Sequence, residues 1–142
     1  MKLRHTKAIV RMILAVALGL LFSINVANAV SLNVSLGLPS AVSLCTPFTI
    51  AISVTNNTNS PIIFNKVAVG YLLQDLKIRG PYEVDTSQHT VPANNTITLN
   101  VLFSINYFPS SGGIVPLSVI LANNNYDKNS MVGAGIGGVK LH

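Results

Sequence analysis

Hydrophobic and polar residues alternate with a period of two through most of the chain after position 29, which is the pattern of strands with one buried face. The clearest example is segment 48–54, where large apolar residues alternate with Thr, Ala and Ser. A register slip of one residue would expose every one of those apolar side chains, so the register should be firmly set. The residues predicted to face inward are Val30, Leu32, Val34, Leu36 and Leu38; Phe48, Ile50, Ile52 and Val54; Ile97, Leu99, Val101, Phe103 and Ile105; and Val115, Leu117, Val119 and Leu121.

Clusters of Asn, Ser, Thr, Gly and Pro separate these segments, and such residues favour turns because of their backbone preferences. They occupy positions 55–61, 91–95, 109–113 and 123–125. Between positions 62 and 73 the alternation changes face, which predicts a β-bulge near Asn65–Lys66. Leu76 and Ile78 stand among charged residues and predict a short edge strand, which Gly80-Pro81 ends before a polar loop at 82–88.

Six or seven short strands, with turns at near-regular intervals, predict a single antiparallel immunoglobulin-like β-sandwich of about seven strands over residues 30–142. A domain of that length can bury a core without disulfides. The Cys and Trp pattern of true immunoglobulin domains is absent, since the chain has no Trp and one Cys. The Gly-rich residues 130–142 are expected to form either a flexible tail or a last strand.

The first 29 residues have the organisation of a secretory signal peptide with a helical apolar segment. Four basic residues precede or bound the apolar run Met12–Ile24, and Ala27-Asn28-Ala29 matches the small-x-small cleavage rule. The alternative is a membrane anchor, but a spanning helix needs about 20 apolar residues and this run is shorter. We therefore expect an exported protein, in the periplasm, outside the cell or on its surface, with no stable membrane span after cleavage.

The formal net charge of +5 comes mainly from this leader. Residues 30–142 keep five basic and four acidic side chains, which leaves +1 with neutral histidines. The basic residues are scattered and no aromatic residues are interleaved with them, so a nucleic-acid partner is not expected. They are Lys66, Lys77, Arg79, Lys128 and Lys140.

Cys45 is the only cysteine, so no disulfide can form within one chain. Because exported proteins meet oxidising conditions, one interpretation is a disulfide between two chains. The other is a small buried hydrophobic residue between Leu44 and Phe48, and it is the interpretation we favour.

No group of residues carries a recognisable chemistry. His89 is the only histidine placed to act as a base, and no nucleophile motif accompanies it. Asp75, Glu83 and Asp85 lack the spacing of a calcium loop and are expected to be solvated loop charges. Residues 133–138 match GxGxxG, but the four residues that follow are too few for the required helix. We therefore expect no enzyme and no catalytic, cofactor-binding or metal-binding residues.

Two further features concern the surface. Asn33, Asn56 and Asn94 begin formal N-glycosylation sequons, and the last two lie in predicted turns, where a glycan can be accommodated. Leu102 and Ile120 fall at positions that the alternation predicts to face outward. They are either covered by the tail or by a partner, or they are scattered surface hydrophobic residues.

The segments Val54-Thr55-Asn56-Asn57, Val69-Gly70-Tyr71-Leu72-Leu73 and Val91-Pro92-Ala93-Asn94-Asn95-Thr96 resemble those of bacterial immunoglobulin-like and fibronectin-III-like modules. The chain is also similar to the late-embryogenesis-abundant type 2 (water-stress hypersensitivity) domain. The resemblance covers roughly residues 46–105. It implies a seven-strand sandwich without catalytic residues.

The sequence therefore predicts an exported, non-enzymatic β-sandwich that acts as a structural or protein-interaction module. Its partner, another protein or a second copy, would meet a sheet edge or the C-terminal residues Met131–Leu141. The alternative is a stress-protective or small-ligand-binding sandwich similar to the water-stress domain.

Overall fold

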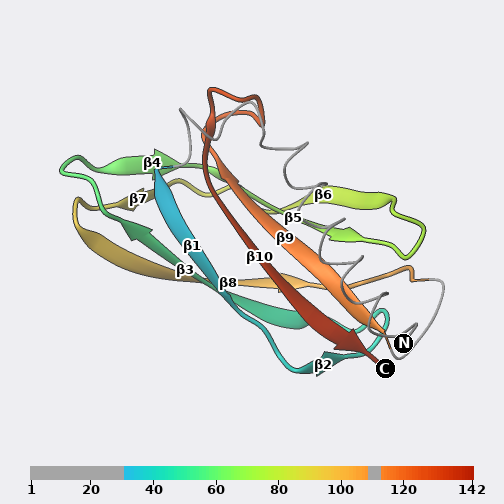
Figure 1. Ribbon diagram of the computed structural model, residues 1–142. Coiled ribbons are helices and arrows are strands. Elements are labelled where there is room, and N and C mark those ends of the chain that lie inside the picture. Colours follow the sequence, from blue (N-terminus) through green and yellow to red (C-terminus); the bar gives the residue numbers. More distant parts are fainter. Residues whose placement is uncertain (1–30, 109–112) are drawn as a thin grey trace, which may run out of the picture.

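The computed structural model describes residues 31–108 and 113–142, and the predicted signal peptide therefore lies outside the described residues. The described residues contain no helix, and so none that could span a membrane. They form ten strands: β1 (Leu32–Gly37), β2 (Ala41–Val42), β3 (Phe48–Asn56), β4 (Ile62–Phe64), β5 (Lys66–Leu72), β6 (Ile78–Asp85), β7 (His89–Val91), β8 (Asn95–Phe103), β9 (Ile114–Ala122) and β10 (Met131–Leu141) (Figure 1).

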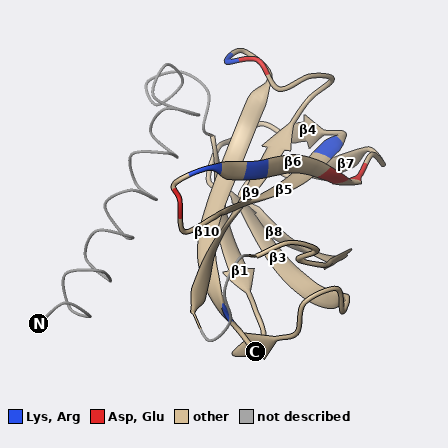
Figure 2. Cartoon of the chain, turned by 90° about the vertical axis from the view of Figure 1, so that its right-hand side faces the viewer, with Lys and Arg blue, Asp and Glu red and all other residues tan. Residues whose placement is uncertain are grey.

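Eight strands form one sheet in the order β6-β5-β9-β10-β1-β3-β8, with the short β2 beside β10, while β4 and β7 form a separate pair. The sheet curls, so that the β5–β6 end lies over the β3–β8 end (Figure 2). The rings of Tyr82 on β6 and Phe103 on β8 come within 6.2 Å, centroid to centroid, although their strands are at opposite ends of the sheet. The all-β prediction is confirmed.

The prediction of a purely antiparallel sandwich is wrong, because the sheet is mixed. β1 runs parallel to β10, and so does β2. Consequently the first long strand and the last strand lie side by side in the middle of the sheet. A period-two pattern identifies the buried face of a strand but carries no information on its direction, so the alternation could not reveal these parallel pairs.

Val30 lies outside the described residues, and the other predicted inward-facing residues form the core enclosed by the curled sheet or pack against it. Those on β3 and β9 are almost fully buried, and Phe48 and Phe103 meet edge to face at 6.1 Å. The paired strands β3 and β8 match residue for residue along nine positions, which keeps their alternating apolar side chains on one face, while Leu102 lies on the other. The largest fully buried side chains are Phe64, Leu32, Ile50, Ile52, Ile105, Leu117, Ile120, Leu121 and Leu141.

The change of face in segment 62–73 is not a bulge, because the chain passes there from one sheet to the other. β4 pairs with β7, and β5 pairs with β6 and β9. Asn65 stands at the crossing, where its backbone N–H donates to the carbonyl of Ala122 at 3.0 Å. The irregular alternation therefore marks a change of hydrogen-bonding partner.

β6 is an edge strand as predicted, but it continues to Asp85 through the segment expected to be a loop. Gly80 adopts φ = 100° before the cis bond to Pro81, and the pairing with β5 shifts register beside them. A Cβ at Gly80 would lie 2.9 Å from the Val69 carbonyl oxygen, so this bend requires glycine. The Gly-Pro pair therefore bends the strand rather than ending it.

The Gly-rich C-terminal segment is the long strand β10 and not a flexible tail. It pairs with β9 from Met131 to Lys140 and lies in the middle of the sheet. Its glycines make room for β1: Cβ atoms at Gly133, Gly135 and Gly137 would lie 3.0, 2.8 and 2.6 Å from side-chain atoms of Val34, Val34 and Leu38. The alternate residues Gly133, Gly135 and Gly137 thus permit close packing between strands, and the match to GxGxxG reflects this packing.

The buried Asn56 joins the end of β3 to β7 and to the turn that follows β3. Its side-chain amide donates to the carbonyls of Ser60 and Val91 at 2.8 and 3.0 Å. Its Oδ1 accepts from the N–H and the hydroxyl of Thr58 at 2.9 and 2.7 Å. Every hydrogen-bonding position of the amide is therefore used, as burial requires.

Gly135→Ala is expected to lower the free energy of unfolding by about 1–3 kcal/mol, because the new methyl group would overlap Val34 and the strand backbone behind it. Denaturant unfolding measures the change. Gly138→Ala on the same strand is the matched control, because its Cβ would meet the side chain of the exposed Ile114, which can move. Equal losses in both variants would contradict the packing role of Gly135.

Asn56→Ala is expected to cost about 1–3 kcal/mol of stability, because it leaves two carbonyl groups without their donor in a buried site. The exposed neighbour provides the comparison: Asn57→Ala should change the unfolding midpoint little. A small effect of Asn56→Ala would mean that water replaces the amide.

Candidate functional site

The main sheet ends at β6 and β8, each with one unpaired side among the described residues, and these two edges differ in charge. β6 carries Arg79, Glu83 and Asp85, a proline and an irregular register. Such features discourage pairing with another strand. β8 has the sequence NTITLNVLF over Asn95–Phe103, without charge or proline, and Figure 2 shows no charged residue on β8 or on its neighbour β3.

β8 is hydrogen-bonded to β3 along its whole length and to no other strand among the described residues. Its outward side chains are exposed, including Leu102 at 68%. The inward Ile97 and Leu99 remain only partly buried, whereas Val101 and Phe103 are buried. The N-terminal part of this edge thus offers both backbone groups and apolar surface, and it is the candidate binding site.

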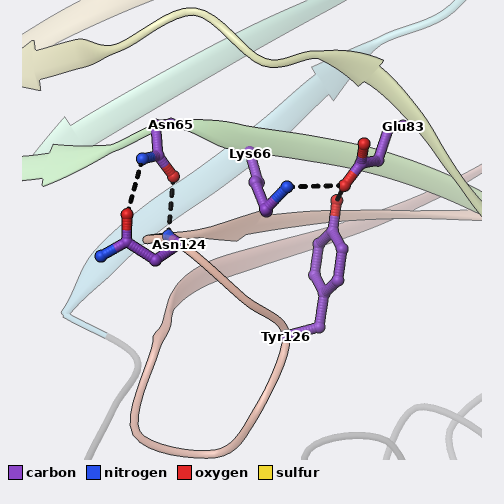
Figure 3. A network of polar contacts seen from close by, with 5 residues as sticks. All are labelled: Asn65, Lys66, Glu83, Asn124 and Tyr126. Atoms are coloured by element: carbon purple, nitrogen blue, oxygen red, sulfur yellow. Dashed lines mark hydrogen bonds and ion pairs between the residues drawn. The ribbon is translucent and has the colours of Figure 1, made fainter.

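A polar cluster on β5, β6 and the β9–β10 loop was not predicted (Figure 3). Lys66 Nζ lies 2.9 Å from Glu83 Oε1, and the Tyr126 hydroxyl donates to the same oxygen at 3.1 Å. Asn65 and Asn124 exchange two hydrogen bonds beside them, of 2.7 and 2.9 Å. These contacts fasten the loop to the sheet.

Electrostatics in this cluster follow from its contacts. The hydrogen bonds from Lys66 and Tyr126 lower the pKa of Glu83. Burial of the phenol, together with its hydrogen bond to the Glu83 carboxylate, raises the pKa of Tyr126 to about 12. Both shifts favour the observed pair of a carboxylate and a neutral phenol. The ion pair itself lies at the surface, where such pairs contribute little.

His89 is paired with Asp85 rather than with a nucleophile. Its Nε2 lies 2.9 Å from Asp85 Oδ2, and its ring packs against Phe64 at 5.2 Å between centroids. Burial raises the pKa of Asp85, but hydrogen bonds from Ser87 and His89 outweigh it and the pKa is lowered. No hydroxyl or thiol is hydrogen-bonded to the imidazole within the described residues.

The three carboxylates considered for calcium have separate partners. Asp75 accepts from the backbone N–H of Lys77, while Glu83 and Asp85 are engaged as described. The described chain contains no cluster of three His, Cys, Asp or Glu side chains that could hold a metal ion.

Cys45 is exposed, so the favoured interpretation of a buried cysteine is wrong. It lies in the left-handed region, with φ = 59°, in a turn that Thr46 closes onto Ser43. Its N–H donates to the carbonyl of Ile105, and its thiol points to the Asn106 carbonyl at 3.7 Å. The turn, rather than the core, determines the exposure of the thiol.

The Asn side chains of the three sequons differ in their exposure. Asn33 and Asn94 are exposed, but the Asn56 amide nitrogen, to which a glycan would attach, is fully buried and makes two hydrogen bonds. Asn56 therefore cannot carry a glycan in this fold.

The two apolar residues predicted to face outward, Leu102 and Ile120, also differ in exposure. Leu102 is exposed on β8, whereas Ile120 is covered and packs in a small second cluster. The other members of that cluster are Ala122, Met131, Tyr126 and Ala134.

No protein-family model matches the sequence, and no curated protein matches it. Among solved structures, the solution structure of the CARDB domain of a Pyrococcus furiosus protein is similar with a TM-score of 0.51 at 12% identity, covering 78% of this chain and 94% of that one. The crystal structure of that domain with di-metal ions gives 0.48 at 9% identity, covering 81% and 90%. A superoxide reductase from Ignicoccus hospitalis gives 0.43 at 13% identity, covering 82% and 86%. At these identities the likeness concerns the fold alone, and the likeness to the solution structure of the CARDB domain supports an all-β module.

The raised pKa of Tyr126 yields a pH prediction. Because the folded value lies above the ordinary value of 10.0, the contribution of this phenol to stability should be complete below pH 10 and be lost as the pH rises through about 12. An absorbance titration of the tyrosines should show a late step near pH 12. Tyr126→Phe should reduce the late absorbance change by one tyrosine, and Glu83→Gln should move the Tyr126 step to lower pH. Some late titration should remain in Tyr126→Phe, because burial also raises the pKa of Tyr71. A late absorbance change of the same size in Tyr126→Phe would contradict the assignment.

Proposed function

We propose that this protein is an exported, non-enzymatic β-sandwich module that binds another protein chain through the β8 edge. The observation that carries the proposal is the uncharged, regular and unpaired side of β8, with half-buried apolar residues behind it. An extended segment of a partner can add to such an edge, gaining backbone hydrogen bonds along its length and side-chain contacts at alternate residues. No charge on β8 opposes this pairing.

The rest of the described surface supports this choice. The polar side chains that might have formed an active centre are engaged in fastening loops: Glu83 to Tyr126, and Asp85 to His89. The signal-peptide pattern of residues 1–29 favours export, and the likeness to a CARDB domain fits an all-β module. The periplasm or the cell surface is the proposed location.

The test is photocrosslinking in the cells that produce the protein. A photoreactive amino acid at Thr98, which is exposed on β8, should give a crosslinked product. The same amino acid at Thr49 is the matched control, because Thr49 is also exposed and faces the same way but lies on β3, one strand in from the edge. Intact mass of the exported protein should show a chain that begins at Val30.

The absence of a crosslinked product from Thr98, or equal products from both sites, would overturn the binding role of β8. A protein retained in the cytoplasm with residues 1–29 in place would overturn export.

A further inference from the structure

The open stretch of the β8 edge runs from Asn95 to Val101. At the far end of the strand Phe103 is buried, and β6 lies close enough for Tyr82 to contact its ring. Towards the N-terminus the inward Ile97 and Leu99 are only partly buried. A strand added beside Asn95–Val101 would cover both of them and complete the core at the position where the curled sheet stays open.

This stretch is complementary to itself. In an antiparallel pair of two copies with the twofold axis at Thr98, Ile97 of one copy lies opposite Leu99 of the other. Thr96 lies opposite Asn100, and the two Thr98 residues face each other. Because residues of the same face oppose one another, the inward side chains of both copies stay on the same side of one continuous sheet.

The chain already contains both kinds of contact. Across the β3–β8 pair the hydroxyls of Thr55 and Thr96 lie 2.8 Å apart on the outward face. On the inward face Ile52 lies opposite Leu99, which is the same combination of aliphatic residues. Pairs of these types stabilise neighbouring strands, and two copies of an uncharged strand avoid the repulsion of like charges placed directly opposite.

We propose that the partner of the β8 edge is a second copy of this chain, joined by antiparallel β8–β8 pairing over Asn95–Val101 about a twofold axis at Thr98. The contact is isologous, so it closes as a dimer and does not propagate into a filament. The β6 edge is unsuited to the same role, because its charges, its proline and its shifted register interrupt a ladder. This inference rests on the proposed function.

The first experiment measures the mass in solution of the protein purified after export from its complete coding sequence. Light scattering over a concentration series should give twice the mass of one chain for the unchanged protein. Thr98→Lys places two ammonium groups opposite each other at the axis and should raise the dissociation constant of the dimer by about tenfold or more. Thr49→Lys adds the same charge on β3 and should leave the dimer intact.

A second experiment tests the register of the β8–β8 pairing. In a Cys45→Ser background, Thr98→Cys should form a dimer linked by a short bifunctional thiol reagent, because residues directly opposite have Cβ atoms about 4.5–5.5 Å apart. Thr49→Cys should not form one. The background removes the exposed native thiol as a competing partner.

A mass of one chain at every concentration, or equal masses for Thr98→Lys and Thr49→Lys, would overturn the dimer. If Thr98 crosslinks in cells to a different protein while the purified chain is monomeric, self-pairing fails and the binding role of β8 stands. If Thr98 gives no crosslink at all, the proposed function fails with it.

Discussion

The close approach of β1 to β10 is the contact on which the arrangement of the sheet depends. Side chains of Val34 and Leu38 occupy the space that Cβ atoms on Gly135 and Gly137 would need. Because that row of β10 carries no side chains, the first long strand and the last strand can lie side by side at the centre of the sheet. The two strands left at the ends, β6 and β8, come from the middle of the sequence. The position of the free edges therefore follows from the glycines of the last strand.

The polar groups of the described residues mainly serve to hold this arrangement. Asn56 is buried with all its hydrogen bonds made, and it joins β3 to the small β4–β7 sheet. Tyr126 and Asn124 hold the β9–β10 loop against β5 and β6. Since those groups already have partners within the chain, the proposed binding site uses instead the backbone of the β8 edge and the apolar residues behind it.

The two edges of the main sheet differ in how strongly they discourage pairing with another strand. β6 combines charge, proline and a bend at Gly80, which are the usual protections of an edge strand. β8 has none of these over nine residues. A regular strand without such protection invites pairing, and the half-buried Ile97 and Leu99 provide the apolar area that makes pairing favourable. The proposed binding through β8 and the protection of β6 thus rest on the same physical property of sheet edges.

The alternation of apolar and polar residues was enough to determine the all-β class and the inward faces of β1, β3, β8 and β9, because burial of one face imposes a period of two. Clusters of turn-forming residues indicated the main turns. Charged residues around Leu76 and Ile78 indicated the β6 edge, although not the length of the strand. Strand order, the parallel pairing of β1 with β10, the change of sheets at Asn65 and the exposure of Cys45 were decided by tertiary structure. So was the contact of Lys66 and Glu83 with Tyr126, which joins residues far apart in the chain. Periodicity reports what each strand buries, but only packing decides which strand lies next to it and which edge stays free.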